Sequence, residues 1–193
     1  GRELVVDMRQ ALLLDNLREA TGGEVPRLGD GLRGFARRQR WGVVGGLAMA
    51  VYGSPRTTLD VDIVVDAGIQ ARLVAFLEEL GYESVWIPDM FGREIYVTAA
   101  HLLAHTSTIT VASGIAHIYG RDPVATAQAG RTLAELSGGR FVQGLGVSHP
   151  IAAEMRGLTW EPPVAAMRAH LEGMRSTPLQ IRAELPPVYI AAH

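Results

Sequence analysis

The chain has 193 residues, 48% of them hydrophobic and 20% charged, with a net charge of −2 and no cysteine. A composition this close to the average of folded proteins excludes extensive disorder, and the small net charge gives no reason to expect a nucleic-acid partner. The lack of cysteine excludes disulfides, thiolate zinc sites and a cysteine nucleophile, and no apolar run approaches the roughly 18 residues that span a bilayer, so we predict a cytoplasmic protein without a membrane partner.

The first part of the chain is predicted to begin with an amphipathic helix. Apolar residues recur at helical spacing over residues 2–20, with charged residues largely opposite. A short buried strand is predicted at residues 41–46, and another strand at 59–66. Asp60 and Asp62 share one face of the second strand, because side chains in a strand alternate between its two faces.

Strands and helices alternate from about residue 69 onward. The first helix ends at Gly81, a residue type that commonly follows a helix. The remaining strands are predicted at 84–88, 108–113, 140–146 and 187–191, and the helices between them at 94–105, 122–136 and 163–174. The helix at 122–136 has Asp122 as N-cap, Pro123 at its first position and Gly138 after its end. This alternation predicts an α/β fold with parallel strands and right-handed crossovers.

A family resemblance runs from about residue 81 to residue 193. The segment TITVASGIAHIYGRDPVATAQAGRTLAELSGGRFVQGLGVSHP resembles the third and fourth strand–helix units of the luciferase-like monooxygenase superfamily, in particular the group that uses the deazaflavin coenzyme F-420. ELGYESVWIPDMFGRE before it and PPVYIAA after it extend the resemblance. It implies a (β/α)8 barrel of the TIM type, of which about four parallel strand–helix units are expected here.

The resemblance also implies a cofactor site at the carboxyl ends of the strands, where such barrels carry their active sites. Residues Ser113, Gly114 and Ile115 are expected to form a bulge, often with a non-proline cis peptide, that backs the ring of F-420 or FMN. The other expected site residues follow the strands: His117, Gly144, Gly146 and Ser148 for the cofactor, and Asp89 and His149 as catalytic candidates beside a small-molecule substrate. His149 is equally compatible with a polar residue that caps the end of a strand.

A second resemblance covers residues 41–66. VVGGLAMAVYGSPRTTLDVDIVVD resembles the minimal nucleotidyltransferase signature of the DNA polymerase β superfamily. Asp60 and Asp62, with Cα atoms about 6.6 Å apart in a strand, would bind Mg²⁺. The backbone amides of Gly45 and Gly46 and the charged side chain of Arg56 would approach the nucleotide phosphates.

The two resemblances divide the chain into a nucleotidyltransferase-like α/β segment at 1–68 and a partial luciferase-like barrel at 69–193. Three functions stay open: an oxidoreductase that transfers hydride with a deazaflavin or flavin, a Mg²⁺-dependent nucleotidyltransferase acting on protein or RNA, and a folded fragment without catalytic activity. An open parallel sheet has unpaired edges, which predicts either a homodimer through those edges or recruitment of the strand at 59–66 into one mixed sheet.

Overall fold

In the computed structural model, the described residues are 41–44, 62–65, 69–89 and 92–191. The chain divides into two compact units, Gly1–Leu73 and Val74–His193, and each is considered by itself. The helix predicted at 2–20 lies outside the described residues. No described helix is long and apolar enough to cross a bilayer.

The described part of the first unit contains a two-stranded antiparallel sheet. Strand β1 (Trp41–Val44) pairs with β2 (Asp62–Val65), so that Trp41 lies opposite Val65 and Val44 lies opposite Asp62. Both strands were expected from the sequence. The expectation that β2 joins the larger sheet is wrong for the described strands, because β2 pairs with β1 in a sheet of its own.

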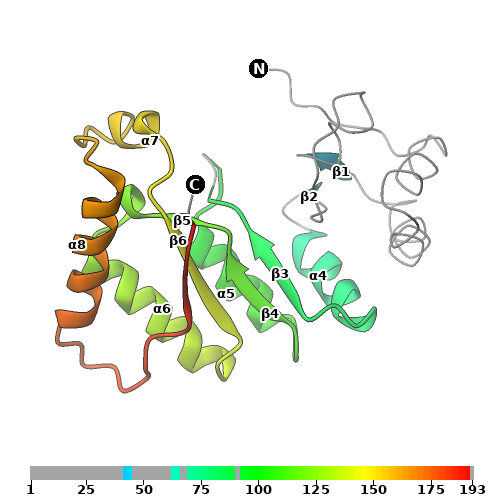
Figure 1. The fold of residues 1–193 in the computed structure, drawn as a ribbon. Coiled ribbons are helices and arrows are strands. Elements are labelled where there is room, and N and C mark those ends of the chain that lie inside the picture. Colours follow the sequence, from blue (N-terminus) through cyan, green and yellow to red (C-terminus); the bar gives the residue numbers. More distant parts are fainter. Residues whose placement is uncertain (1–40, 45–61, 66–68, 90–91, 192–193) are drawn as a thin grey trace. The chain divides into compact units, whose positions relative to one another are not determined.

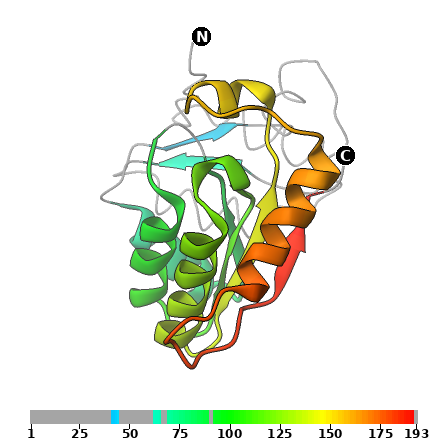
Figure 2. The same ribbon diagram turned by 90° about the vertical axis from the view of Figure 1, so that its left-hand side faces the viewer.

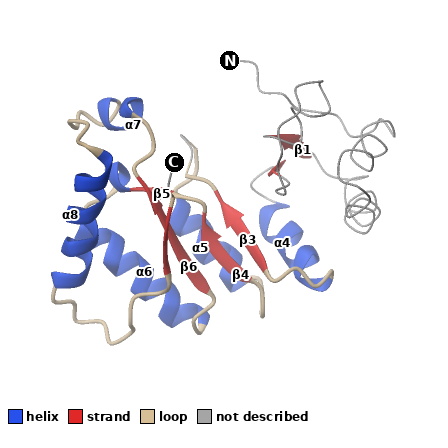
Figure 3. Cartoon of the chain, in the orientation of Figure 1, coloured by secondary structure: helices blue, strands red, loops and turns tan. Residues whose placement is uncertain are grey.

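The second unit is built around a parallel sheet. Its four main strands are β3 (Ser84–Ile87), β4 (Thr110–Ser113), β6 (Phe141–Gly146) and β7 (Val188–Ile190). Each pairs with its neighbour in parallel, in the order β3, β4, β6 and β7. The four parallel strands expected from the sequence are therefore confirmed, and they alternate with helices (Figure 3).

A fifth, short strand continues the line of β4 along β6. In β4, Val111 lies opposite Phe141, whereas in β5 (Ala116–His117) Ala116 lies opposite Leu145. The chain advances by five residues from Val111 to Ala116, but β6 advances by only four from Phe141 to Leu145. One extra residue on one of two paired segments defines a β-bulge. The bulge falls on residues 113–115, between the two paired segments.

Helices cover one face of the parallel sheet. Figures 1 and 2 show α5 (Ile95–Ala104), α6 (Pro123–Ser137) and α8 (Pro163–Ser176) along this face. Helix α6 has the expected boundaries, because Asp122 accepts a hydrogen bond from the Ala125 amide at its start and Gly138 has a positive φ of 64° at its end. Two short helices were not expected, η2 (Ile118–Gly120) and α7 (Pro150–Glu154).

A buried glutamine ties the sheet to α5 and α6. The fully buried Gln143 donates from Nε2 to the Tyr96 hydroxyl at 2.8 Å and to the Thr126 carbonyl at 3.0 Å. A Cβ at Gly130 on α6 would lie only 2.4 Å from Gln143 Oε1, so the glycine leaves room for the amide. Burial is the main cause that raises the pKa of Tyr96 to about 12, which keeps its hydroxyl neutral in this network.

A carboxylate at the end of α4 (Gln70–Glu79) holds the loop that leads into β4. Glu78 accepts hydrogen bonds from the backbone amides of Ser107 at 2.9 Å, Thr108 at 2.5 Å and Ile109 at 2.7 Å. These bonds, those from Ile109 and Thr108 first, lower the pKa of Glu78 to about 2. They also explain why β4 begins at Thr110, two residues later than expected.

Replacing Glu78 with Gln is expected to lower the melting temperature at pH 7, because a neutral amide accepts these bonds more weakly than a carboxylate. The folded pKa of about 2 lies below the ordinary value of 4.5, so the stabilisation is fully present above pH 4.5 and is lost as the pH falls toward 2. Melting followed by circular dichroism should therefore show a difference between the two proteins that shrinks below pH 4.5. Glu79→Gln, at the exposed neighbouring position, is the control, and an equal loss in both variants would contradict the assignment.

Candidate active site at the carboxyl rim of the sheet

The carboxyl ends of the parallel strands lie along one edge of the sheet, here called the carboxyl rim. Asp89 lies two residues after β3, Ser113 ends β4, His117 ends β5 and Gly146 ends β6. The residues expected to bind the cofactor or to act in catalysis therefore lie near or just after strand ends on this rim. The structure joins some of them by hydrogen bonds and leaves others apart.

The bulge at residues 113–115 is built from a buried and an exposed part. Ser113 is fully buried, and its hydroxyl donates a hydrogen bond of 2.8 Å to the carbonyl oxygen of Gly144. Gly114 is exposed, and the Gly114-Ile115 peptide is cis. A cis peptide implied by the family resemblance is therefore present at the expected position.

Glycines and an indole pack closely against this bulge. A Cβ at Gly144 would lie 2.0 Å from the Ser113 carbonyl oxygen, and a Cβ at Gly146 would lie 2.7 Å from Ile115 Cδ1. The Cβ and Cε3 atoms of Trp86 lie 3.3 Å from the place of a Cβ at Gly114. The exposed backbone at Gly114 is thus a surface without side chains on a closely packed base, and a planar deazaflavin or flavin ring is compatible with it.

Asp89 is the centre of a buried polar cluster on the rim. Its side chain is only 7% exposed, and Oδ2 accepts a hydrogen bond of 3.4 Å from the backbone amide of His117. The His117 ring Nε2 lies 3.6 Å from Oδ2, and Arg121 Nη1 lies 3.4 Å from it. Among the described residues, all of these contacts go to Oδ2, and Oδ1 has none.

Arg121 connects Asp89 to α5, and sequence reasoning missed it. Its Nη2 forms an ion pair with the carboxylate of Glu94, the N-cap residue of α5, and its guanidinium lies 4.6 Å above the Tyr96 ring. Arg121 directly precedes the α6 cap residue Asp122 in the RDP segment. Arg121 lies within the segment that carries the family resemblance, but no site role was expected for it.

His117 is the most deeply buried ionisable group of this cluster, with 5% of its side chain exposed. Burial is the largest cause that lowers the pKa of His117, and the positive charge of Arg156 acts in the same direction. The negative charge of Asp89 opposes them. The neutral imidazole is therefore favoured, and its buried Nδ1 has no hydrogen-bond partner among the described residues.

Ser148 and His149 occupy an exposed part of the rim. Ser148 has a positive φ of 62°, which is uncommon for a residue other than glycine and turns the chain between β6 and α7. His149 is the N-cap residue of α7, but its side chain makes no capping hydrogen bond. Within the described residues, no hydrogen bond or ion pair connects His149 to Asp89, so the two catalytic candidates are not joined in one network.

The residues of the nucleotidyltransferase resemblance cannot be compared in the same way. Of these, Gly45, Gly46, Arg56 and Asp60 lie outside the described residues, and Asp62 is the first residue of β2. No group of three or more histidine and carboxylate side chains able to hold a metal ion occurs in the described part of the chain.

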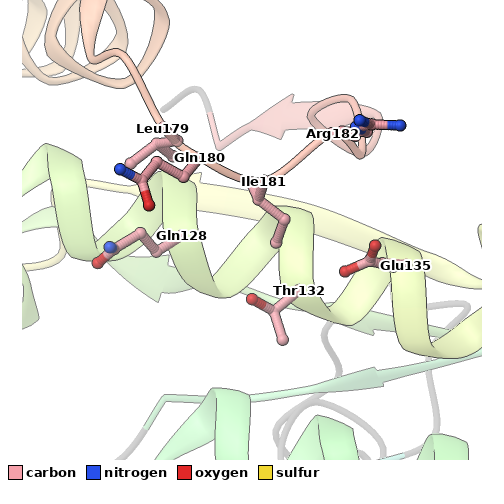
Figure 4. Close-up of a pocket in the computed structure, with 7 residues that line it drawn as sticks. All are labelled: Gln128, Thr132, Glu135, Leu179, Gln180, Ile181 and Arg182. Carbon is pink, nitrogen blue, oxygen red and sulfur yellow. The ribbon is translucent and has the colours of Figure 1, made fainter.

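A cavity of about 660 Å³ lies away from the strand-end residues. One side is formed by Gln128, Thr132 and Glu135, which follow one another at helical spacing on α6, and the other side by residues 179–182 (Figure 4). None of the residues predicted for the cofactor or for catalysis lines it. The geometry of the rim, rather than this cavity, defines the candidate active site.

Comparisons with known proteins show which family this chain resembles. Residues 54–178 match the profile of a family described as luciferase-like monooxygenase. The match begins upstream of residue 81, where the sequence resemblance was expected to begin, and therefore overlaps the segment assigned to a nucleotidyltransferase. The expectation of a boundary between two families near residue 68 has no support from this match.

Two curated relatives are 5,10-methylenetetrahydromethanopterin reductases. The one from Methanolobus tindarius is 32% identical over 55% of this chain and 35% of its own length, and the one from Archaeoglobus fulgidus is 36% identical over 53% of this chain and 31% of its own length. This chain therefore covers about a third of the curated relatives it matches.

Solved structures share the fold at lower identity. An F-420-dependent secondary alcohol dehydrogenase in complex with an F-420–acetone adduct matches with a TM-score of 0.53 and 16% identity, over 62% of this chain and 46% of that chain. The oxygenating component of 3,6-diketocamphane monooxygenase from Pseudomonas putida, in complex with FMN, matches with a TM-score of 0.51 and 16% identity, over 61% and 38%. These structural similarities show that the chain shares its fold with TIM-barrel-like enzymes.

Gly144→Ala is expected to lower the free energy of unfolding by about 1–3 kcal/mol, the usual cost of overpacking a core. The added methyl group would meet the Ser113 carbonyl at 2.0 Å, and backbone cannot move away as a flexible side chain can. Urea denaturation measures the change. Gly92→Ala adds the same methyl group where nothing lies within 4 Å and should be nearly neutral, so equal losses in both variants would argue against the close packing of the bulge.

Proposed function

Because the chain belongs to the luciferase-like monooxygenase family, we propose that its carboxyl rim binds the ring of F-420 or FMN and supports hydride transfer with a small-molecule substrate. The observation that carries the proposal is the exposed bulge at Gly114, set on the closely packed base of Gly144, Gly146 and Trp86. Relatives that are reductases and a structural neighbour with a bound F-420 adduct support it.

The bulge would position the cofactor ring. Backbone at Gly114 and Ile115 can approach a planar ring closely, because Gly114 has no side chain and Ile115 turns its own side chain toward Gly146. Ser148 lies at the rim, where its positive φ turns the chain, and would contact the edge of the ring or its side arm. A bound deazaflavin or flavin supplies the hydride chemistry, and the protein supplies position, exclusion of water and a proton-transfer group.

Asp89 is the favoured proton-transfer group. Its Oδ2 is held by the His117 amide and by Arg121, so the carboxylate has a fixed orientation, while Oδ1 has no contact among the described residues and can face a substrate. A fixed carboxylate with one oxygen available can accept or return a proton at the reacting carbon or oxygen. His149 is the second candidate, since it is exposed at the same rim.

The proposal predicts saturable binding of F-420 or FMN, measured as a change in cofactor fluorescence during titration with the full chain. Gly114→Val should weaken binding at least about tenfold, because its side chain would start 3.3 Å from Trp86 and push the backbone that backs the ring out of place. Ala104→Val adds a branched side chain at an exposed position on the last residue of α5 and should leave binding unchanged. Unchanged fluorescence of both cofactors at high protein concentration would reject the site.

Replacing Asp89 with Asn should slow hydride transfer about 100-fold while cofactor affinity stays the same, because the amide keeps the shape but cannot take up a proton. The rate is measured as oxidation of reduced F-420 by the best acceptor in a panel of small ketones, imines and enones. His149→Gln is the comparison and should have the smaller effect. A larger loss in His149→Gln would move the proton-transfer role to His149.

A further inference from the structure

The chain between β6 and α8 starts at the carboxyl rim and is here called the rim segment, residues 147–162 (Figure 1). Helix α7 lies in its first half and ends in a tight turn. Gly157 has a positive φ of 67° there, and its amide donates to the Glu154 carbonyl, while the amide of Leu158 donates to the Ala153 carbonyl. This pair of hydrogen bonds is that of a helix end closed by a glycine. The turn leads the chain on to Trp160.

Trp160 and Tyr119 join the rim segment to η2. Their rings are stacked, with centroids 5.3 Å apart and planes inclined by 24°. The Tyr119 hydroxyl also accepts a hydrogen bond of 3.0 Å from the backbone amide of Glu161. The face and the hydroxyl of Tyr119 are thus both bound by the rim segment, and the Tyr119–Trp160 pair is here called the aromatic clamp.

The turn η2 lies between two residues that contact Asp89. His117 directly precedes η2, and its backbone amide donates to Asp89 Oδ2. Arg121 directly follows η2, and its Nη1 lies 3.4 Å from the same oxygen. Tyr119 is the middle residue of η2. A displacement of Tyr119 would therefore move both of the groups that hold the carboxylate.

Close packing joins η2 to the His117 ring. A Cβ at Gly120 would lie 3.1 Å from the ring Cε1 and 3.3 Å from Nε2, so the last residue of η2 lies directly against the imidazole. The first residue, Ile118, is buried. Closely packed groups move together, because there is no free volume between them to take up a displacement. The same imidazole Nε2 lies 3.6 Å from Asp89 Oδ2, so a movement of η2 reaches the carboxylate.

We propose that Tyr119 and Trp160 are positioning residues, which keep Asp89 in its reactive orientation by clamping η2 to the rim segment. The inference rests on the proposed role of Asp89 as the proton-transfer group. Among the described residues, no hydrogen bond or ion pair joins either clamp residue to Asp89, so both act through His117 and Arg121. Misplacing a reacting group by about 1 Å can slow a reaction about 100-fold, so even a partial loosening of η2 is measurable.

Kinetics measure the effect of the clamp on the reaction. Trp160→Leu removes the stack and is expected to slow hydride transfer about tenfold at saturating cofactor, while the cofactor Kd changes less than about twofold. Trp160→Phe restores an aromatic ring and should recover most of the rate. Tyr119→Phe keeps the stack, loses only the bond to the Glu161 amide, and should lie between the two.

Met155→Ala is the matched control. It removes a large side chain that is 65% exposed in the same rim segment, and it should leave the rate and the cofactor Kd unchanged. Circular dichroism checks that every variant melts cooperatively. An equal loss of rate in Met155→Ala and Trp160→Leu would contradict a specific role of the clamp.

A double-mutant cycle tests whether the clamp acts through Asp89. In the Asp89→Asn protein, Trp160→Leu should slow the remaining reaction less than about twofold, because a positioning effect disappears with the group that is positioned. A merely structural role would cost the same factor in both backgrounds. A tenfold loss in the Asp89→Asn background would therefore overturn the proposal.

Amide hydrogen exchange, followed by NMR without cofactor, separates this inference from the proposed function. Trp160→Leu should speed exchange of the His117 amide at least about threefold, since a lost aromatic stack makes local opening of η2 easier, and Met155→Ala should leave it unchanged. Faster exchange in a protein that binds no cofactor would reject the proposed function and retain the clamp on Asp89. Unchanged exchange in Trp160→Leu would overturn the clamp even in an active enzyme.

Discussion

The backbone of β6 pairs along one side with two successive segments, β4 and β5, whose registers differ by a single residue. That difference leaves residues 113–115 unpaired with β6 and presents Gly114 at the carboxyl rim. The hydroxyl of Ser113 then reaches the carbonyl of Gly144, and the two backbones approach so closely that a side chain at Gly144 would meet the Ser113 carbonyl. The surface proposed for the cofactor is thus a product of strand register rather than of a flexible loop.

The register also determines where the ionisable groups of the rim meet. After the bulge, β5 delivers the amide and ring of His117 to Asp89, while the turn that follows brings Arg121 to the same carboxylate. Arg121 continues to Glu94 at the start of α5 and lies over Tyr96, whose hydroxyl belongs to the buried network of Gln143. Arg121 therefore connects the carboxylate of the site to α5 and, through Tyr96, to the buried core.

Local sequence signals predicted the elements well, because the information lies within a few residues. Asp122, Pro123 and Gly138 fixed the limits of α6, and alternating apolar runs located the four parallel strands. What sequence reasoning missed depends on contacts between distant residues. The start of β4 depends on Glu78, some thirty positions earlier in the chain, and the room for Gln143 depends on Gly130 of another element.

The positions of the candidate site residues could be predicted from the sequence, but their contacts could not. Positions at strand ends follow from the order of the elements, so the rim residues could be named in advance, and the family resemblance supplied the bulge. The partners of each side chain could not be named, because ion pairs such as that between Arg121 and Asp89 depend on how two loops of unknown conformation approach each other. The sequence favoured His149 as the acid or base, yet of the two catalytic candidates only Asp89 has a buried, hydrogen-bonded side chain.

The proposed hydride transfer would set one further requirement on this arrangement. Electrostatic control of a proton-transfer group is strong only where water is excluded, since charges interact far more weakly in water than in a protein interior. Asp89 and His117 already meet this condition, but Gly114 is exposed and Trp86 beneath it is half exposed. The candidate site is therefore shielded from water at Asp89 and His117 and exposed to water at Gly114 and Trp86. Burial of Gly114 and Trp86 would exclude water from the surface that is proposed to back the cofactor.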